Sequence, residues 1–322
     1  MRVLALVPGE ISDQILFLPT LEGLKQAFPK AEIAVVVEPR AKAAYSVSKI
    51  VNEVIPFDYE ASNSPADWGN LLGIVRDREF EVALSTSGRW EEGMLLWLSG
   101  VPTRVTYSTT RTPWLYTRTV PFQTGQSQAQ TYCDLLKALS IATPCSAPAL
   151  SLPQRDLDWA NATRDRLGIK EGYVVIYPGP TPSAAGQSDS YPIDSWLSVI
   201  KDFQSKQPQL PLVLLQTADS RAAIKQLMAQ ATDLKVVEAD SLSKAAAMIA
   251  GADLVLTPNS DIMQLAIALQ VFTLGLMGAG TSDAVLPAQT NQKDKRFLAV
   301  KSSTNQLADL SPDTVLQQVW GS

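Results

Sequence analysis

An aspartate stands directly after the first apolar segment of the chain, where parallel α/β proteins commonly keep their reactive groups. Residues 3–7 form a short apolar run, a Pro-Gly pair interrupts it, and apolar residues at helical spacing follow from Ile15. This pattern predicts a buried strand, a tight loop and a helix, and the strand expected at 32–37 completes a βαβ unit. Ligands of such sheets bind beyond the carboxyl ends of the strands, so Asp13 is the candidate catalytic residue.

The chemistry that suits Asp13 is proton abstraction from a hydroxyl. The chain contains no histidine, so acid–base work near neutral pH falls to Asp or Glu, and hydrolases with a Ser-His pair and the common zinc enzymes are excluded. Glu10 and Ser12 share the loop and are candidate ligand contacts, together with Arg111 in the Thr-rich stretch 108–125, which could meet an anionic or sugar ligand. The alternative interpretation is that Ser12 or Asp13 only caps the following helix, which is worth about 1 kcal/mol.

Three further loops carry groups that suit an anion. Residues 177–192 (YPGPTPSAAGQSDSYP) follow a predicted strand and are rich in Gly, Ser and Thr, whose N–H and hydroxyl groups bind phosphate, although a plain surface loop is the alternative. Residues 257–264 lead into a predicted helix, whose N-terminus attracts anions. Residues 277–282 follow the next predicted strand at the same edge. The candidate anion-binding residues of these loops are Gly179, Thr181, Ser183, Asn259, Ser260, Asp261, Ile262, Gln264 and Gly278.

Regularly alternating strand and helix patterns position these loops. The alternation is interrupted once, by the proline-rich stretch TPCSAPALSLP at 143–153. We therefore predict two α/β domains, 1–150 and 151–322, each a doubly wound parallel sheet, with a ligand cleft at their interface. The last helix, 312–320, closes the chain and is a candidate to pack back on the N-terminal domain. Residues 108–125 lack clear periodicity and are expected to form a long loop.

Composition limits the class of protein. The chain has 322 residues, of which 46% are hydrophobic and 18% charged, so large cores are expected. A net charge of −5 argues against a nucleic-acid partner. No apolar run is long enough for a signal peptide or a membrane span, so a cytoplasmic protein is expected. Cys133 and Cys145 lack CxxC spacing, and we expect one buried thiol and one loop thiol without metal or redox chemistry.

Four stretches taken together resemble glycosyltransferase family 9, the enzymes similar to ADP-heptose:lipopolysaccharide heptosyltransferases. PGEISDQILFLPTLEGLKQAFPKAEIAVVV is similar to the family's opening, WLSGVPTRVTY to its G-[IV]-[PK]-x-R-[IV] stretch, YVVIYPG to its V-[IV]-x-x-P-G loop, and GADLVLTPNSDIMQLAIALQVFTLGLMG to its last long motif. The resemblance covers most of the chain. It implies a GT-B fold: two Rossmann-like domains facing across a cleft, the N-terminal one for the acceptor and the C-terminal one for a nucleotide-sugar.

The resemblance also implies a chemistry. Family members are inverting transferases that need no bound metal, and the only nucleotide compound they require is the nucleotide-diphosphate sugar that is their substrate, with no separate cofactor. Asp13 matches the family's proposed base and would deprotonate an acceptor hydroxyl, while the loop at 177–179 and the helix start at Ser260 would hold the diphosphate. On this model Glu10, Ser12 and Arg111 become candidate acceptor contacts, and the anion-binding residues of the three further loops become candidate donor contacts. The implied acceptor is lipopolysaccharide or another glycan or lipid-linked molecule. A peripheral contact with the inner face of the cell membrane is compatible with such an acceptor.

The donor motif departs from the family at three positions, where Asn259 replaces Asp, Asp261 replaces Gly and Gln264 replaces His. The family's Lys before a Tyr-Pro pair is also missing. Two unit charges 4 Å apart repel by roughly 4 kcal/mol at an effective dielectric of 20, whereas a helix N-terminus attracts an anion by about 0.3–1 kcal/mol. Asp261 therefore outweighs the helix dipole if it faces the phosphates, whereas the site persists with weakened affinity if Asp261 turns outward in a capping box with Gln264.

Three hypotheses follow from these observations. The first is an active glycosyltransferase with a changed donor, which uses Asp13 as its base. The second is a degenerate member of the family that binds a sugar, a nucleotide or a protein without turnover. The third is an ordinary α/β binding protein in which Asp13 is only a helix cap.

Overall fold

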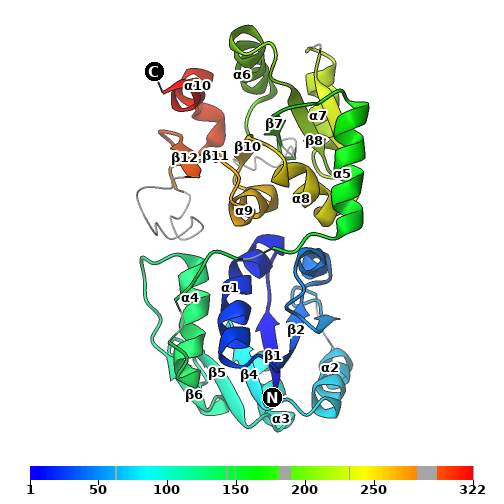
Figure 1. Ribbon diagram of the computed structural model, residues 1–322. Helices are drawn as coiled ribbons and strands as arrows, with labels where there is room; N and C mark the ends of the chain where they lie inside the picture. The colour runs from blue at the N-terminus through cyan, green and yellow to red at the C-terminus, as the bar shows by residue number, and fades with distance from the viewer. Residues whose placement is uncertain are drawn as a thin grey trace. The chain divides into compact units, whose positions relative to one another are not determined.

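A computed structural model of the chain describes residues 1–61, 64–142, 144–148, 150–180, 190–231, 233–280 and 296–321. The chain divides near Ser151 into two compact units, and each unit builds its own sheet (Figure 1). Unit 1 begins at Met1, and unit 2 begins at Leu152.

Unit 1 contains a parallel six-stranded sheet in the order β3-β2-β1-β4-β5-β6. This is the Rossmann strand order, in which the sheet grows first to one side of β1 and then to the other, and ligands bind at the carboxyl ends where the order reverses. The strands are β1 (Arg2–Val7), β2 (Glu32–Val37), β3 (Glu53–Pro56), β4 (Val82–Ser85), β5 (Thr103–Tyr107) and β6 (Arg118–Val120).

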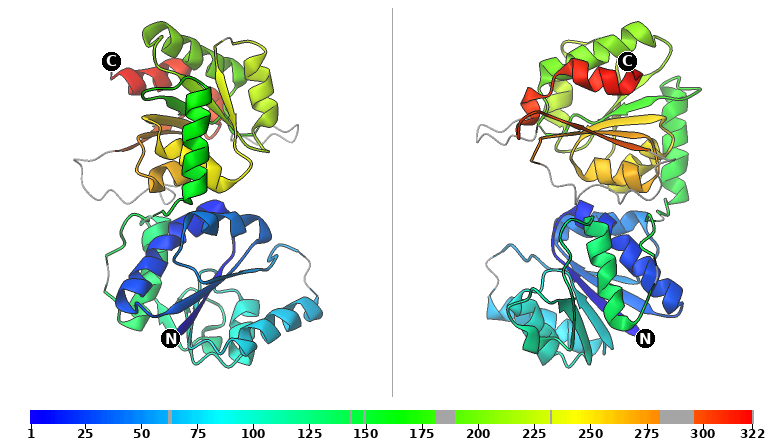
Figure 2. Two further views of the ribbon diagram at one scale, coloured as in Figure 1. Left: turned by 45° about the vertical axis from the view of Figure 1, so that its right-hand side comes forward. Right: turned by 90° about the vertical axis from the view of Figure 1, so that its left-hand side faces the viewer.

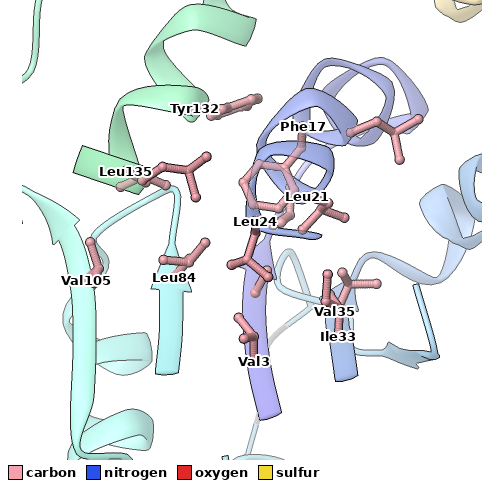
Figure 3. Packing of buried hydrophobic residues seen from close by; sticks show 14 of the residues in the cluster. Val3, Phe17, Leu21, Leu24, Ile33, Val35, Leu84, Val105, Tyr132 and Leu135 are labelled. Carbon is pink, nitrogen blue, oxygen red and sulfur yellow. The ribbon is translucent and has the colours of Figure 1, made fainter. Parts of the chain in front are cut away.

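Helices cover both faces of this sheet, because successive strand residues point to opposite sides. On one face Val3 packs with Phe17 and Leu135, in a core shared by α1 and the segment around α4 (Figure 3). On the other face Leu4 packs with Leu95 of α3. The helices and 3-10 turns are α1 (Ile11–Ala27), η1 (Pro39–Val47), α2 (Pro65–Asp77), α3 (Trp90–Leu98), η2 (Pro113–Leu115), α4 (Gln128–Asp134) and η3 (Leu135–Leu139).

Unit 2 repeats the architecture with the strand order β12-β11-β10-β7-β8-β9, again all parallel. Figure 2 shows helices on both faces of each sheet. The strands are β7 (Val174–Ile176), β8 (Leu212–Gln216), β9 (Lys235–Glu238), β10 (Leu254–Pro258), β11 (Thr273–Met277) and β12 (Phe297–Lys301). The helices are α5 (Gln154–Arg166), α6 (Ile193–Lys206), α7 (Arg221–Met228), α8 (Leu242–Ala250), α9 (Asp261–Ala268), η5 (Leu307–Asp309) and α10 (Pro312–Trp320).

The last helix, α10, packs on α6 within unit 2. Val315 is fully buried in the core that also holds Phe203. Trp320 donates its indole N–H to Asp202 at 2.7 Å and stacks beside Phe203. The apolar side of α10 is therefore buried on α6 within unit 2, and its contact with the N-terminal domain stays a prediction.

Two edge strands were not predicted from the sequence. β6 lies in the stretch 108–125 that was expected to be a long loop, and it pairs with β5 from Val105 to Tyr107. β12 pairs with β11 along its whole length. β6 has only three residues, too few to show a periodic pattern in the sequence.

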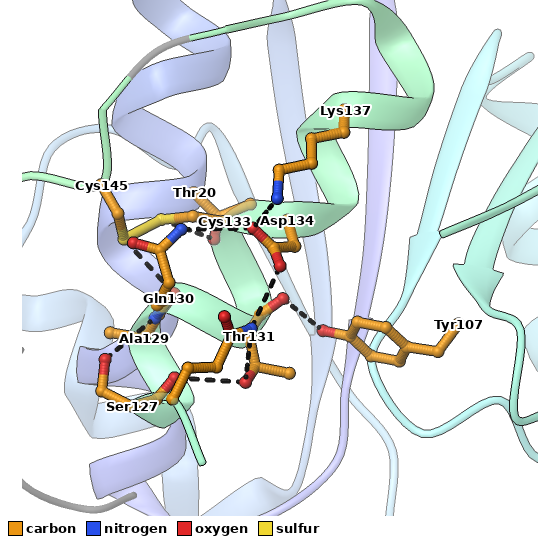
Figure 4. Close-up of a disulfide and its surroundings, with 11 residues drawn as sticks. Thr20, Tyr107, Ser127, Ala129, Gln130, Thr131, Cys133, Asp134, Lys137 and Cys145 are labelled. Atoms are coloured by element: carbon orange, nitrogen blue, oxygen red, sulfur yellow. Dashed lines mark hydrogen bonds and ion pairs between the residues drawn. A yellow bond between two sulfur atoms is a disulfide. The ribbon is translucent and has the colours of Figure 1, made fainter. Parts of the chain in front are cut away.

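The two cysteines are also paired, so the expectation of two separate thiols is wrong. Cys133 lies in α4 and Cys145 in residues 144–148, and the two form a disulfide (Figure 4). The chain doubles back after η3, which brings the two Cα atoms to 5.8 Å, within the range that a disulfide spans. Sequence spacing carries no information about this reversal of direction.

Candidate active site

Asp13 lies at the carboxyl end of β1, in the first turn of α1. The N-cap of α1 is Glu10 rather than Ser12 or Asp13, and Asp13 occupies the third helical position of a capping box. Its Oδ2 accepts a hydrogen bond from the backbone N–H of Glu10 at 2.9 Å. The side chain is half-buried. Asp13 is thus part of the cap, as the alternative interpretation held, and its second oxygen is left for other partners.

Gly9 makes room for this carboxylate. Its φ of +123° is a backbone conformation that side chains rarely adopt, and a Cβ added there would lie 2.3 Å from Asp13 Oδ2. The Pro-Gly pair therefore does more than end the strand, because only glycine allows the aspartate to fold back against the loop.

The second oxygen of Asp13 is held by α4. Oδ1 accepts from Gln128 Nε2 at 2.6 Å and from the Tyr132 hydroxyl at 3.1 Å. Burial, and next the Asp13 charge, raise the pKa of Tyr132, so its phenol stays a proton donor near neutral pH. Sequence reasoning missed both residues, which lie 115 and 119 positions away along the chain.

Of the other candidate acceptor residues, Glu10 and Ser12 lie beside Asp13 and Arg111 lies apart from it. Glu10 forms an ion pair with Arg40 at 2.9 Å, and Arg40 also contacts Glu60 at 2.8 Å, which ties the loops after β1, β2 and β3 together. Ser12 is half-buried beside Asp13. Arg111 is exposed in the segment after β5, two strands away from β1 in the sheet.

A further carboxyl group, also missed from the sequence, lies beyond the adjacent strand β4. Glu92 of α3 is fully buried, and its two oxygens accept from Ser85 Oγ at 2.5 Å and Ser87 Oγ at 2.7 Å. Burial raises the pKa of Glu92 to about 7, despite the two hydroxyl donors that lower it. Perturbed carboxyl groups of this kind are enriched at functional sites. The glutamate falls on the apolar side of α3, which was the one available signal.

The loops predicted for the donor meet at one edge of the unit 2 sheet. Gly179 follows β7, Asn259 follows β10 and Gly278 follows β11, and these three parallel strands are neighbours. Two backbone bonds extend the ladder to this edge, from Tyr177 N–H to Leu256 and from Asn259 N–H to Leu276. The predicted convergence is therefore present within unit 2. Thr181 and Ser183 lie outside the described residues.

Ser260 begins the helix at this edge. Its Oγ accepts from the N–H of Met263 at 3.3 Å, which makes it the N-cap of α9 and leaves Asp261 as the first helical residue. The suggested capping box between Asp261 and Gln264 is therefore wrong. Gln264 and Ile262 are buried, at 3% and 4% exposure, so any ligand contact from them would have to use the backbone.

Glycine is required at Gly179 and at Gly278 for different structural reasons. Gly179 has φ +75°, and the nearest atom to an added Cβ is Pro258 Cγ at 3.4 Å, so the conformation rather than the space requires glycine. A Cβ at Gly278 would lie 2.4 Å from the carbonyl oxygen of Asn305. Packing of the chain against itself is thus sufficient to explain Gly278.

Comparison with solved structures defines the class of fold. The glycosyl transferase family 9 structure from Veillonella parvula matches with a TM-score of 0.84 at 15% identity, covering 99% of this chain and 96% of that one. The ADP-heptose lps heptosyltransferase II of E. coli matches with a TM-score of 0.79 at 17% identity, covering 100% and 98%. The fold is therefore α/β of the GT-B type, built from two Rossmann-like units.

The family follows from the sequence match. Residues 69–311 match the model of glycosyltransferase family 9 (heptosyltransferase), and the chain belongs to this family. Among curated proteins it is similar to the photosynthetic NDH subunit of subcomplex B 1, chloroplastic, from Arabidopsis thaliana, at 20% identity over 98% of this chain and 72% of that protein. Within the described residues, no helix combines the length and the apolar character that a membrane span requires.

Proposed function

We propose that the protein is an inverting, metal-independent glycosyltransferase that moves a heptose-like sugar from a nucleotide-diphosphate donor to a glycan or lipid-linked acceptor such as lipopolysaccharide. Family membership supports sugar transfer. The loop after β1 supports a carboxylate base, and the edge formed by β7, β10 and β11 supports a diphosphate site. The proposal assigns no metal and no separate cofactor to the reaction.

The observation that carries the proposal is the way in which Asp13 is held. A general base must be fixed in orientation and still reach a substrate proton. Asp13 is half-buried, with Oδ2 held by the loop and Oδ1 held by Gln128 and Tyr132. In the proposed step Asp13 takes the proton of an acceptor hydroxyl, and the hydroxyl oxygen attacks the anomeric carbon. The nucleoside diphosphate leaves from the opposite face with the bonding electrons.

The donor is expected to bind through backbone groups. The first N–H groups of α9 have no partner within the helix, and Ser260 caps one of them. The side chain of Asp261 adds a negative charge in the first turn, which disfavours a diphosphate at short range. We therefore expect weaker donor binding than in a relative with glycine at this place, and a donor other than the family's usual one.

Replacing Asp13 tests the base. Asp13→Asn keeps the shape of the capping box, so we expect donor binding and fold to persist while transfer falls by a factor of ~10²–10⁴, the usual range for a general base. The matched control is Asp67→Asn. Asp67 is the third residue of α2, in a capping box in which its Oδ2 accepts from the N–H of Ser64 at 2.8 Å. The control variant should lose similar helix-cap stability and keep full transfer; unchanged turnover in Asp13→Asn removes the proposed role.

A second candidate function is binding without turnover. Three observations favour it: Asn259, Asp261 and Gln264 replace the residues of the family's donor motif. Calorimetric titration with ADP, UDP, GDP and CDP separates the two candidates. Binding of one nucleotide that Ser260→Trp abolishes supports a donor site, and transfer that Asp13→Asn abolishes then supports the transferase over binding without turnover. A folded protein that binds none of the four supports a degenerate member that recognises another partner.

A further inference from the structure

The disulfide lies against both helices that hold Asp13. Cys133 directly follows Tyr132, which donates to Asp13 Oδ1. The hydroxyl of Thr20, in the same helix as Asp13, donates to Cys133 Sγ at 3.8 Å. The sulfur of Cys145 lies 3.3 Å from the carbonyl oxygen of Ala129, in the first turn of α4 (Figure 4). The bond is therefore next to the hydrogen bonds that orient the proposed base.

The two sulfurs differ in accessibility. Cys133 is 6% exposed and packs under α4, whereas Cys145 is half-buried on residues 144–148, which form neither helix nor strand. An external thiolate therefore reaches Cys145 more easily than Cys133. Cys145 lies in no helix or strand, so reduction removes no backbone hydrogen bond directly and only lets the first turn of α4 open more often. Unit 1 can then keep its fold in both redox states.

We propose that the Cys133–Cys145 disulfide is a reducible switch that controls how firmly α4 holds Asp13. This inference rests on the proposed function, since it concerns regulation of the same site. In the oxidised protein, residues 144–148 are tied against the first turn of α4, which keeps Gln128 and Tyr132 against Asp13. In the reduced protein the tie is lost, the first turn of α4 loosens, and Asp13 loses part of its orientation.

The chemical step is thiol–disulfide exchange with a dithiol. One thiolate of the dithiol attacks Sγ of Cys145, and Sγ of Cys133 leaves as a thiolate that takes up a proton. The second thiol of the reagent then attacks the mixed disulfide and releases Cys145 as a thiol. Two electrons and two protons pass to the protein, and the dithiol ends as a disulfide.

Hydrogen exchange of the full chain tests the inference without any assay of transfer. We expect dithiothreitol to make both cysteines available to iodoacetamide and to speed amide exchange in the peptide covering 127–134, with little change in the cap of α2 around Ser64. Cys145→Ser should show the fast exchange with and without dithiothreitol. Transfer by the reduced protein should fall by about tenfold, since small displacements of a catalytic group are costly.

Two results would overturn the switch. One is a folded protein whose two sulfurs stay unreactive to iodoacetamide after dithiothreitol, which would make the bond purely structural. The other is complete reduction with unchanged exchange in 127–134. Faster exchange in a protein that transfers no sugar in either state supports the switch and counts against the proposed function, so the two failures are distinguishable.

Discussion

The carboxyl edges of the two sheets share one strand order and differ in what they offer a ligand. In unit 1 the edge is built from side chains: Asp13 is held by Glu10 N–H, Gln128 and Tyr132. In unit 2 the corresponding loops contain Gly179, Gly278 and the helix N-cap Ser260. Two of the candidate side chains there, those of Ile262 and Gln264, are buried. The same topology thus presents an oriented carboxylate in one unit and backbone N–H groups in the other.

Because of this difference, the two candidate sites should respond differently to substitution. An oriented carboxylate depends on every group that touches it, including residues far away along the chain. A backbone site depends mainly on the path of the loop, so most side-chain changes should leave it intact. Substitutions at matched positions of the two edges therefore test whether the edges differ in this way.

The largest contrast is expected between Gly9→Ala and Gly179→Ala. Both positions have positive φ, so strain of about 1–3 kcal/mol is expected at each. Only at Gly9 does the new Cβ collide with a functional group, since Asp13 Oδ2 would lie 2.3 Å away. We expect Gly9→Ala to reduce transfer by about a hundredfold, in line with the cost of displacing a catalytic group.

Urea unfolding and transfer rates of the two variants provide the measurement. Gly100→Ala is the matched control within unit 1, because Gly100 has φ +77° and nothing within 4 Å of an added Cβ. The control should lose stability and keep transfer. Equal losses of transfer in Gly9→Ala and Gly100→Ala would show that strain alone, and not displacement of Asp13, causes the defect.

An intermediate effect on stability is expected from Glu92, and it depends on pH. Its pKa is raised from 4.5 to about 7 by burial, so the folded protein binds this proton more tightly than the unfolded chain does. The stabilisation is fully present below about pH 4.5 and is lost as the pH rises through about 7. Each pKa unit is worth about 1.4 kcal/mol. Glu92→Gln should therefore flatten the fall of the unfolding free energy across this range.

Glu53 is the control of opposite sign for this experiment. The side-chain hydrogen bonds with Arg78 lower the pKa of Glu53, so its stabilisation is present at neutral pH and is lost as the pH falls. Glu53→Gln should weaken the protein at pH 7 more than at pH 3. A Glu92→Gln variant whose unfolding free energy keeps the wild-type slope between pH 4.5 and 7 contradicts the assignment of that slope to Glu92.

The smallest effect is expected at the cap of α9. Ser260→Ala removes the bond to the N–H of Met263 and should cost about 1 kcal/mol, as for other N-caps. Ser64→Ala at the cap of α2 should cost a similar amount. The two variants should differ in nucleotide affinity. If the α9 edge holds a diphosphate, only Ser260→Ala should change this affinity in a calorimetric titration. An equal change in both would place the nucleotide elsewhere.

Much of this fold could be predicted from the sequence, because the signals are local. Residues that are near one another in the sequence make up the apolar runs of β1 and β10 and the helical spacing of α1. The arrangement in two sheets follows from the alternation of strand and helix patterns along the chain. The meeting of the loops after β7, β10 and β11 also follows, since parallel strands end at a common edge. The glycosyltransferase family 9 resemblance is confirmed by the family match.

The features that were missed depend on contacts between distant residues. Gln128 reaches Asp13 across 115 positions, and no spacing rule connects a glutamine in one helix with an aspartate in another. The disulfide forms because the chain turns back after η3, which is a property of the assembled unit. Glu92 is buried through the packing of α3, although its residue type favours the surface. Asp13 as a base and the donor contacts of unit 2 stay predictions.

The hydrogen bonds from α4 to Asp13 determine at which stage of folding the candidate site can form. Contacts that close a long stretch of chain form late in folding, after local helices and neighbouring strands. During synthesis the aspartate leaves the ribosome before its partners in α4, which emerge more than a hundred residues later. A nascent chain that stops before α4 would therefore carry the aspartate without its orienting partners. Asp13 would be oriented only after the whole of unit 1 has been synthesised.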